Sequence, residues 1–232
     1  HTNLGLLQSE TGQAKEAEAS FAEAIRLQER LLGLEPGNPE RLRNLAASLN
    51  NLGALSVGRE AGRAAELYQK ALAYQTKAAS ARPAELKYRS DVALTQNNLG
   101  AVLSRSGRLA EAATSYGRAV ELQQELVRAA PAQKAYRHDL AVSYNNLGLT
   151  QSSLRQAAEA EKSFRQALDL QETLVRQNPG DLDLHSSLGG IYNNLATVQE
   201  ELQRPAEAAA SYLRAIEHQK TAQAQAPKVS RY

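Results

Sequence analysis

The amino-acid sequence predicts an all-α solenoid of about five stacked antiparallel helix pairs. Three observations predict it: one motif returns at a nearly constant interval, apolar residues between its copies are spaced three or four apart, and no segment alternates with the period of a β-strand. Such an interval is typical of proteins in which each unit packs against its neighbours. Hydrophobic residues make up 42% of the chain and aromatic residues only 5%, which suits helices packed through alanine.

The recurring motif is Asn-Asn-Leu-Gly, found at 50–53, 97–100 and 145–148, with Asn-Asn-Leu-Ala at 193–196 and Thr-Asn-Leu-Gly at 2–5. Its second Asn, called the marker Asn below, returns after 48, 47, 48 and 48 residues. The marker Asn residues are Asn3, Asn51, Asn98, Asn146 and Asn194. We therefore predict a single array over 1–232, with units at 1–36, 37–83, 84–131, 132–179 and 180–227. Because the chain starts at His1 and both ends fall inside a unit, we expect a piece of a longer protein.

Each unit is predicted to hold two helices. In the fourth unit, the first helix is expected over 134–154 and the second over 156–177. One aromatic ring recurs in register along the second helices: Phe21, Tyr68, Tyr116, Phe164 and Tyr212. An alanine recurs three residues later: Ala24, Ala71, Ala119, Ala167 and Ala215. A ring one turn from a small residue allows close helix contact, and we expect the glycine of the motif to leave room for a neighbouring helix.

Proline and glycine mark the ends of the predicted helices. Proline cannot continue a helix, and it recurs after each second helix, at Pro36, Pro83, Pro131, Pro179 and Pro227. The turn inside a unit often holds glycine, at Gly12, Gly62 and Gly107. We place the missing residue of the 47-residue step in this inner turn, because a deletion there shifts no packed face.

Gly148, Ala160, Phe164 and Ala167 have the spacing of the tetratricopeptide repeat, which the chain resembles over nearly its whole length. The usual repeat has 34 residues, and the longer unit here is similar to those of kinesin light chains and nephrocystin-like proteins. The segment 136–148 also resembles repeat regions attached to bacterial serine/threonine protein kinases, those of planctomycetes especially. The resemblance implies a right-handed superhelix whose first helices line a concave groove, where a peptide or partner protein binds without catalysis.

The marker Asn and its helical neighbours form the candidate binding surface that the resemblance places in this groove. An Asn amide carries both a donor and an acceptor, so a row of them could hold the backbone of an extended peptide while the variable neighbours select its sequence. The candidate peptide-binding residues are Asn3, Asn51, Asn98, Asn146, Asn194, Leu94, Ala101, Arg105, Val142 and Leu149. The alternative stays open: an Asn at one place in every unit could instead bridge adjacent helices inside the stack.

Other recurring polar residues are assigned to the stack. The first Asn of the motif points about 100° away from the marker Asn around the helix, and we expect internal bridging by Asn50, Asn97, Asn145 and Asn193. A similar role is expected for Gln28, Gln75, Gln123, Gln171 and Gln219. Tetratricopeptide domains that clamp chaperone C-terminal carboxylates use a lysine one turn before the groove Asn. Such a clamp is not expected here, because those places hold Ala47, Leu94, Val142 and Gly190, which favour a segment with apolar anchors.

Composition and motifs argue against several other functions. The net charge is only +2 and there is no cysteine, so neither nucleic-acid binding nor a thiolate metal site is indicated. No apolar run reaches the roughly 18 residues of a membrane span, and we expect a cytoplasmic protein. No phosphate loop or nucleophile motif occurs, so we expect no cofactor and no catalysis. The histidines lack metal-ligand spacing and are expected at the surface or at helix boundaries: His1, His138, His185 and His218. Four carboxylates are expected to be solvated: Glu16, Glu18, Glu200 and Glu201.

The sequence thus predicts a non-catalytic scaffold that binds a peptide segment or a partner protein. Two alternatives stay open. The units could stack end to end into a filament, because open solenoid ends expose apolar faces. The array could also be the regulatory repeat region of a larger signalling kinase.

Overall fold

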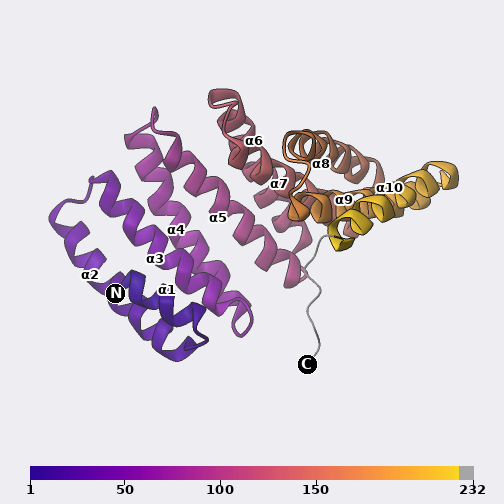
Figure 1. Cartoon of the computed structure of the whole chain (residues 1–232). Helices are drawn as coiled ribbons and strands as arrows, with labels where there is room; N and C mark the ends of the chain where they lie inside the picture. The colour runs from indigo at the N-terminus through magenta and orange to yellow at the C-terminus, as the bar shows by residue number, and fades with distance from the viewer. Residues whose placement is uncertain (225–232) are drawn as a thin grey trace. The chain divides into compact units, whose positions relative to one another are not determined.

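The computed structural model describes residues 1–224, and these residues are helical almost throughout, with no strand among them (Figure 1). They form two compact parts, an N-terminal part, His1–Leu122, and a C-terminal part from Gln123 onward. Five helix pairs occur in the described residues: α1 (Thr2–Glu10) with α2 (Ala14–Leu34), α3 (Pro39–Ser56) with α4 (Ala61–Ala81), α5 (Leu86–Arg105) with α6 (Leu109–Ala129), α7 (Lys134–Ser153) with α8 (Ala157–Gln177), and α9 (Leu182–Glu201) with α10 (Pro205–Ala224). The predicted all-α fold of stacked helix pairs is confirmed.

Within each part, neighbouring helices pack in chain order. In the N-terminal part α2 packs on α3, α3 on α4 and α4 on α5, while in the C-terminal part α7 packs on α8, α8 on α9 and α9 on α10. The boundary between the two parts falls inside α6, so the single array over 1–232 stays a prediction. The helices expected over 134–154 and 156–177 are α7 and α8, each correct to within one residue.

The helix ends follow the chemistry that the sequence predicts. The second helices α2, α4, α6 and α8 each end two residues before a proline. Pro227 lies outside the described residues. The α3 N-terminus is capped by Asn38, whose side chain accepts hydrogen bonds from the backbone N–H groups of Glu40 and Arg41, which satisfies donors that a helix leaves unpaired.

The inner turns of four units share one left-handed residue. Glycine takes this conformation without strain at Gly12 and Gly107, with φ of 76° and 75°. The equivalent residues are Arg155 and Gln203, with φ of 62° and 59°, so these two turns keep the same shape without glycine. The turn between α3 and α4 has four residues, 57–60, where the other inner turns have three, but α3 ends five residues after its marker Asn whereas the other first helices end seven after theirs. The 47-residue step therefore shortens the end of α3 rather than the turn, so the predicted place of the missing residue was wrong. Gly62, expected in that turn, lies instead in the first turn of α4.

An aromatic ring packs directly on the motif glycine in four helix pairs. A Cβ atom added at Gly148 would lie 2.7 Å from Cε1 of Phe164, and one at Gly100 would lie 2.9 Å from Cδ1 of Tyr116. The rings are almost fully buried, with Phe164 exposed by 1% and Tyr116 by 4%. The same contact joins Gly5 to Phe21 and Gly53 to Tyr68. The prediction that this glycine makes room for a neighbouring helix is therefore confirmed.

The last helix pair shows what happens when the glycine is replaced. Ala196 carries a methyl group at this position and is fully buried. The ring of Tyr212 is only half-buried there, and its hydroxyl donates to Glu200 at 3.1 Å. The recurrent alanines three residues after the rings are buried in all five pairs: Ala24, Ala71, Ala119, Ala167 and Ala215.

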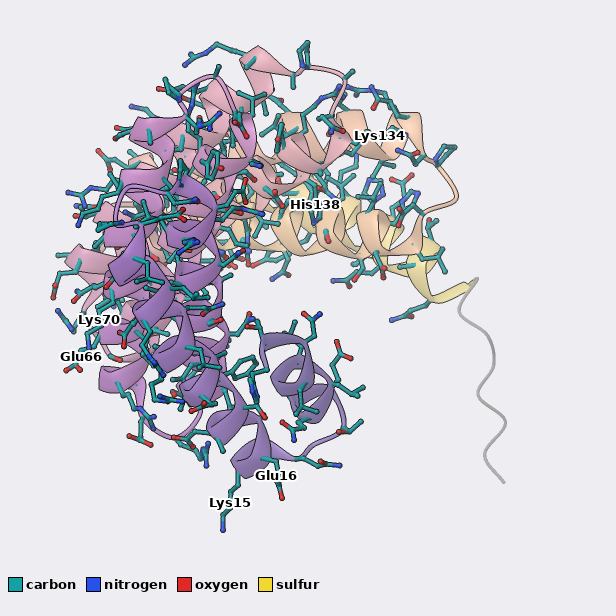
Figure 2. The ribbon with its side chains drawn as sticks, turned by 90° about the vertical axis from the view of Figure 1, so that its left-hand side faces the viewer. Lys15, Glu16, Glu66, Lys70, Lys134 and His138 are labelled. Atoms are coloured by element: carbon teal, nitrogen blue, oxygen red, sulfur yellow. The ribbon has the colours of Figure 1, made fainter. Side chains whose placement is uncertain are left out.

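Some charged side chains link adjacent units of the stack, whereas others only face solvent. Glu18 of α2 accepts hydrogen bonds from Arg63 of α4 at 2.6 Å and from Arg59 at 3.3 Å. The Arg63 guanidinium holds the pKa of Glu18 below its usual value. The expectation of a solvated Glu18 was therefore wrong, whereas Glu16 does point into solvent, as Glu66 does (Figure 2).

The ring–glycine contact can be tested by comparing two glycines on adjacent helices. In Gly100→Ala the new methyl group meets the Tyr116 ring, and such overpacking costs about 1–3 kcal/mol of unfolding free energy. In Gly117→Ala nothing lies within 4 Å of the added Cβ, so higher helix propensity should stabilise by about 1 kcal/mol. Urea denaturation followed by circular dichroism measures both. Equal stabilisation by the two variants would contradict the assigned role of the ring.

Candidate functional site

A hollow of about 240 Å³ lies between the first helices α3 and α5. We call it the first hollow, and its lining residues are Arg43, Asn44, Ala47, Asn50, Asn51, Ala54, Gln75, Asp91, Leu94 and Asn98. The α3 and α5 residues recur at three-, four- and seven-residue intervals, so each helix presents one face to the hollow. Gln75 comes from α4 and is 4% exposed, which places it at the floor.

A hollow of about 230 Å³ lies at the equivalent place in the C-terminal part, between α7 and α9. This second hollow is lined by Ala141, Val142, Asn145, Gln171, Ser187, Gly190, Ile191 and Asn194. Gln171 occupies the same register as Gln75, and its Nε2 donates to the backbone oxygen of Leu184 at 3.0 Å. The repeat therefore forms the same kind of hollow in both parts of the chain.

The first hollow contains two hydrogen-bond acceptors that lack a donor among the described residues. Asn50 donates through Nδ2 to Oγ1 of Thr95 at 2.6 Å, so it bridges α3 to α5 as predicted. The Oδ1 atom of Asn50 and the Oε1 atom of Gln75 are buried without a partner. Leaving a buried acceptor unpaired costs about 1–3 kcal/mol, so a ligand that supplies N–H donors would gain from binding here.

The charges in the first hollow neutralise each other. Arg43 of α3 donates through Nε to Oδ2 of Asp91 on α5 at 2.5 Å. The hollow therefore presents amides and small apolar groups rather than a net charge. The large apolar residue exposed in it is Leu94, which is 55% accessible.

Hydrogen bonding differs in the second hollow because of one substitution. Ile191 stands where α5 has Thr95, so Asn145 has no hydroxyl to bond. Instead, Oδ1 of Asn145 accepts from Nδ2 of the marker Asn194 at 2.9 Å. In this unit the marker Asn thus bridges two first helices, which is the alternative role that the sequence left open.

The structure brings together part of the candidate set. Asn51, Asn98 and Leu94 line the first hollow, while Val142 and Asn194 line the second. The other candidates line neither hollow: Asn3, Ala101, Arg105, Asn146 and Leu149.

The bridging predictions for the other recurring polar residues have mixed outcomes. Bridging is confirmed for Asn50, Asn145 and Gln171. It is wrong for Asn193 and Gln219, whose side chains are exposed. Sequence reasoning missed Asn44, Asp91 and Ser187, although each lies seven residues before a marker Asn and therefore on the same helix face.

His185 is not the surface or boundary residue that the sequence indicates. It is 8% exposed, and its Nε2 and Nδ1 atoms lie 3.0 Å from the Pro179 backbone oxygen and from Nδ1 of His218. Burial and the neighbouring His185 lower the pKa of His218. Within the described part of the chain, no three His, Cys, Asp or Glu side chains gather as a metal site, and no helix has the length and hydropathy to cross a membrane.

Family models of the tetratricopeptide repeat match residues 2–40, 91–173 and 189–220. The chain belongs to the tetratricopeptide repeat family. Tetratricopeptide repeats generally serve as scaffolds for protein interaction rather than as catalysts. No curated protein matches this sequence significantly.

Several solved structures share the fold at low sequence identity. A putative kinesin light chain of Podosopora anserina with nearly identical repeats aligns with a TM-score of 0.64 at 20% identity, covering 96% of this chain and 94% of that chain. MamA aligns with a TM-score of 0.52 at 17% identity, covering 95% and 96%. BtubC from P. vanneervenii gives 0.51 at 20% identity, covering 94% and 96%. At these identities the likeness shows the fold alone.

Proposed function

We propose that this tetratricopeptide protein is a non-catalytic scaffold that binds a peptide segment of a partner protein in the first hollow. The observation that carries the proposal is the meeting of Asn51 and Asn98, from two consecutive first helices, in one hollow with unpaired acceptors at its floor. Both marker Asn side chains are half-buried, and neither makes a side-chain hydrogen bond to another described residue, unlike Asn194.

The chemistry of the first hollow suits a peptide backbone. Each Asn amide can donate to a peptide C=O and accept from a peptide N–H. Gln75 and Asn50 add two acceptors that need N–H donors, and a peptide backbone supplies one N–H at every residue except proline. A ligand held in this way is recognised through its main chain.

Helix spacing sets the register of such a ligand. Packed helices lie about 8–10 Å apart, and an extended peptide rises about 3.3 Å per residue. Asn51 and Asn98 would therefore meet peptide groups about three residues apart. The residues between them face Ala47, Ala54 and Leu94, which favour a small apolar anchor at the central position.

The proposal is tested by selecting peptides on the full chain from a random display library. Selected peptides are then titrated by calorimetry into the wild type and into Asn51→Ala/Asn98→Ala. Loss of the two amides should weaken binding at least about tenfold, equivalent to about 1.4 kcal/mol.

The matched control is Asn193→Ala, because Asn193 is an exposed motif Asn outside both hollows. This variant should bind as the wild type does. Equal affinity of the wild type and the Asn51→Ala/Asn98→Ala variant, with circular dichroism showing both folded, would contradict peptide binding in the first hollow.

A second candidate function is self-association through apolar helix faces. Leu31 and Leu34 of α2 are 49% and 77% exposed, and Leu213 and Ile216 of α10 are 68% and 47% exposed. The residue in the register of Ile216 on α8, Leu168, is only 6% exposed because it is packed into the stack. A second copy of the chain could cover Ile216 in the same way, extending the stack end to end.

Self-association predicts that the particle mass rises with protein concentration. Multi-angle light scattering from low to high micromolar concentration measures it, with electron microscopy for filaments. Ile216→Glu should reduce the association, because a buried carboxylate lacks a partner there. A constant monomer mass over this range would reject the second candidate.

A further inference from the structure

A larger hollow lies in the N-terminal part between the second helices α4 and α6, with α5 as its floor. Its volume is about 660 Å³, and we call it the α4–α6 groove. Gln96 and Leu99 of α5 form part of its floor, Leu72 lies on the α4 wall and Arg118 on the α6 wall. On α5, Gln96 lies two residues from both Leu94 and Asn98, which is about 200° around the helix. The groove therefore lies on the face of α5 opposite the first hollow.

The groove coincides with a difference at one position of the repeat, where two later units carry a tyrosine and this unit does not. Gln96 lies two residues before its marker Asn, and the residues at this place in other units are Leu49, Tyr144 and Tyr192. In the last unit the ring of Tyr192 occupies the equivalent space between α8 and α10. It stacks on His218 with ring centroids 5.9 Å apart, and its hydroxyl donates to Glu172 of α8. The hollow left beside Tyr192 measures only about 230 Å³.

The floor of the groove also has an unmet acceptor. Gln96 is 7% exposed, and its Oε1 has no hydrogen-bond partner within the described residues. Leu99 beside it is 6% exposed and Leu72 is half-buried. An aromatic ring with a hydroxyl donor matches this combination of an apolar wall and an unpaired acceptor. Tyr192 supplies such a ring and donor in the last repeat unit.

The rim of the groove carries positive charge. Lys77 of α4 and Arg118 of α6 line it, and neither makes an ion pair within the part of the chain that the structure describes. The acidic residue of the rim, Glu111, is already held by Arg108 through two hydrogen bonds of 2.7 Å and 2.6 Å. The rim is therefore complementary to a segment with carboxylates on both sides of its anchor.

We infer that the α4–α6 groove docks an acidic segment of a partner protein through a tyrosine side chain. The ring fills the space that Tyr192 fills in the last unit, and its hydroxyl donates to Oε1 of Gln96. Carboxylates that flank the tyrosine pair with Lys77 and Arg118. This surface is separate from the first hollow, so one scaffold could hold two different segments at once.

The experiment uses the full chain and a fluorescein-labelled probe peptide, Gly-Asp-Glu-Tyr-Glu-Asp-Gly. Fluorescence anisotropy should show saturable binding with a dissociation constant below about 1 mM. Peptides with alanine in place of tyrosine, or with lysine in place of the acidic residues, should bind at least about tenfold more weakly. Absence of saturable binding, or equal affinity for the alanine peptide, would overturn the inference.

Two variants locate the binding on the protein. Gln96→Tyr fills the groove with the chain's own ring, as in the last unit, and should weaken binding at least about tenfold while circular dichroism shows an intact fold. Lys77→Ala/Arg118→Ala leaves the groove open and should weaken binding and reduce its dependence on salt. Unchanged affinity in both folded variants would overturn the inference.

Two controls separate this surface from the rest of the molecule. Lys15→Ala removes an exposed cation on α2, a helix that contributes no residue to the groove (Figure 2), and it should leave the affinity unchanged. Asn51→Ala/Asn98→Ala should also leave it unchanged. Loss of binding in that variant alone would place the probe in the first hollow and overturn the assignment to the groove.

Discussion

Close packing of an aromatic ring on a glycine backbone joins the two helices in four of the five described helix pairs, and the positions of the hollows depend on it. In these four pairs the ring of the second helix covers a place where its partner helix has no side chain, so the two helices approach closely at one fixed register. The next first helix then packs on the outer side of the second helix, as α5 does on α4 and α9 on α8. The first helices of consecutive repeats, α3 with α5 and α7 with α9, therefore face each other across a narrow gap. The first and second hollows lie in those two gaps.

The two asparagines of the motif, neighbours on the same first helix, make different contacts at that gap. Asn50 points toward α5 and bonds Thr95, whereas its neighbour Asn51 faces the hollow without such a bond. The division depends on the residue that the first Asn meets. Where Ile191 replaces the hydroxyl, Asn145 takes its hydrogen bond from the marker Asn194. The marker Asn194 is thus hydrogen-bonded within the stack beside an apolar residue, and the two hollows differ in chemistry although the backbone repeats.

Much of the fold could be predicted from the sequence because it depends on local, periodic features. The prolines fix where second helices end, and the constant spacing between Gly148 and Phe164 already encodes their contact. The site was less predictable, because its floor combines side chains from three helices. Gln75 recurs visibly in the sequence, yet only the structure shows its Oε1 unpaired beside Asn51. The buried contact between His185 and His218 likewise joins residues 33 positions apart, on two different helices.

We propose that the marker Asn amides of the first hollow touch the bound peptide directly. Nitrogen-15 spectra of the side-chain NH₂ groups, recorded while a library-selected peptide is titrated into the full chain, measure this contact residue by residue. The Asn51 and Asn98 side-chain signals should shift progressively to saturation while the Asn193 signal stays in place. Unmoved Asn51 and Asn98 signals at full peptide occupancy would contradict it.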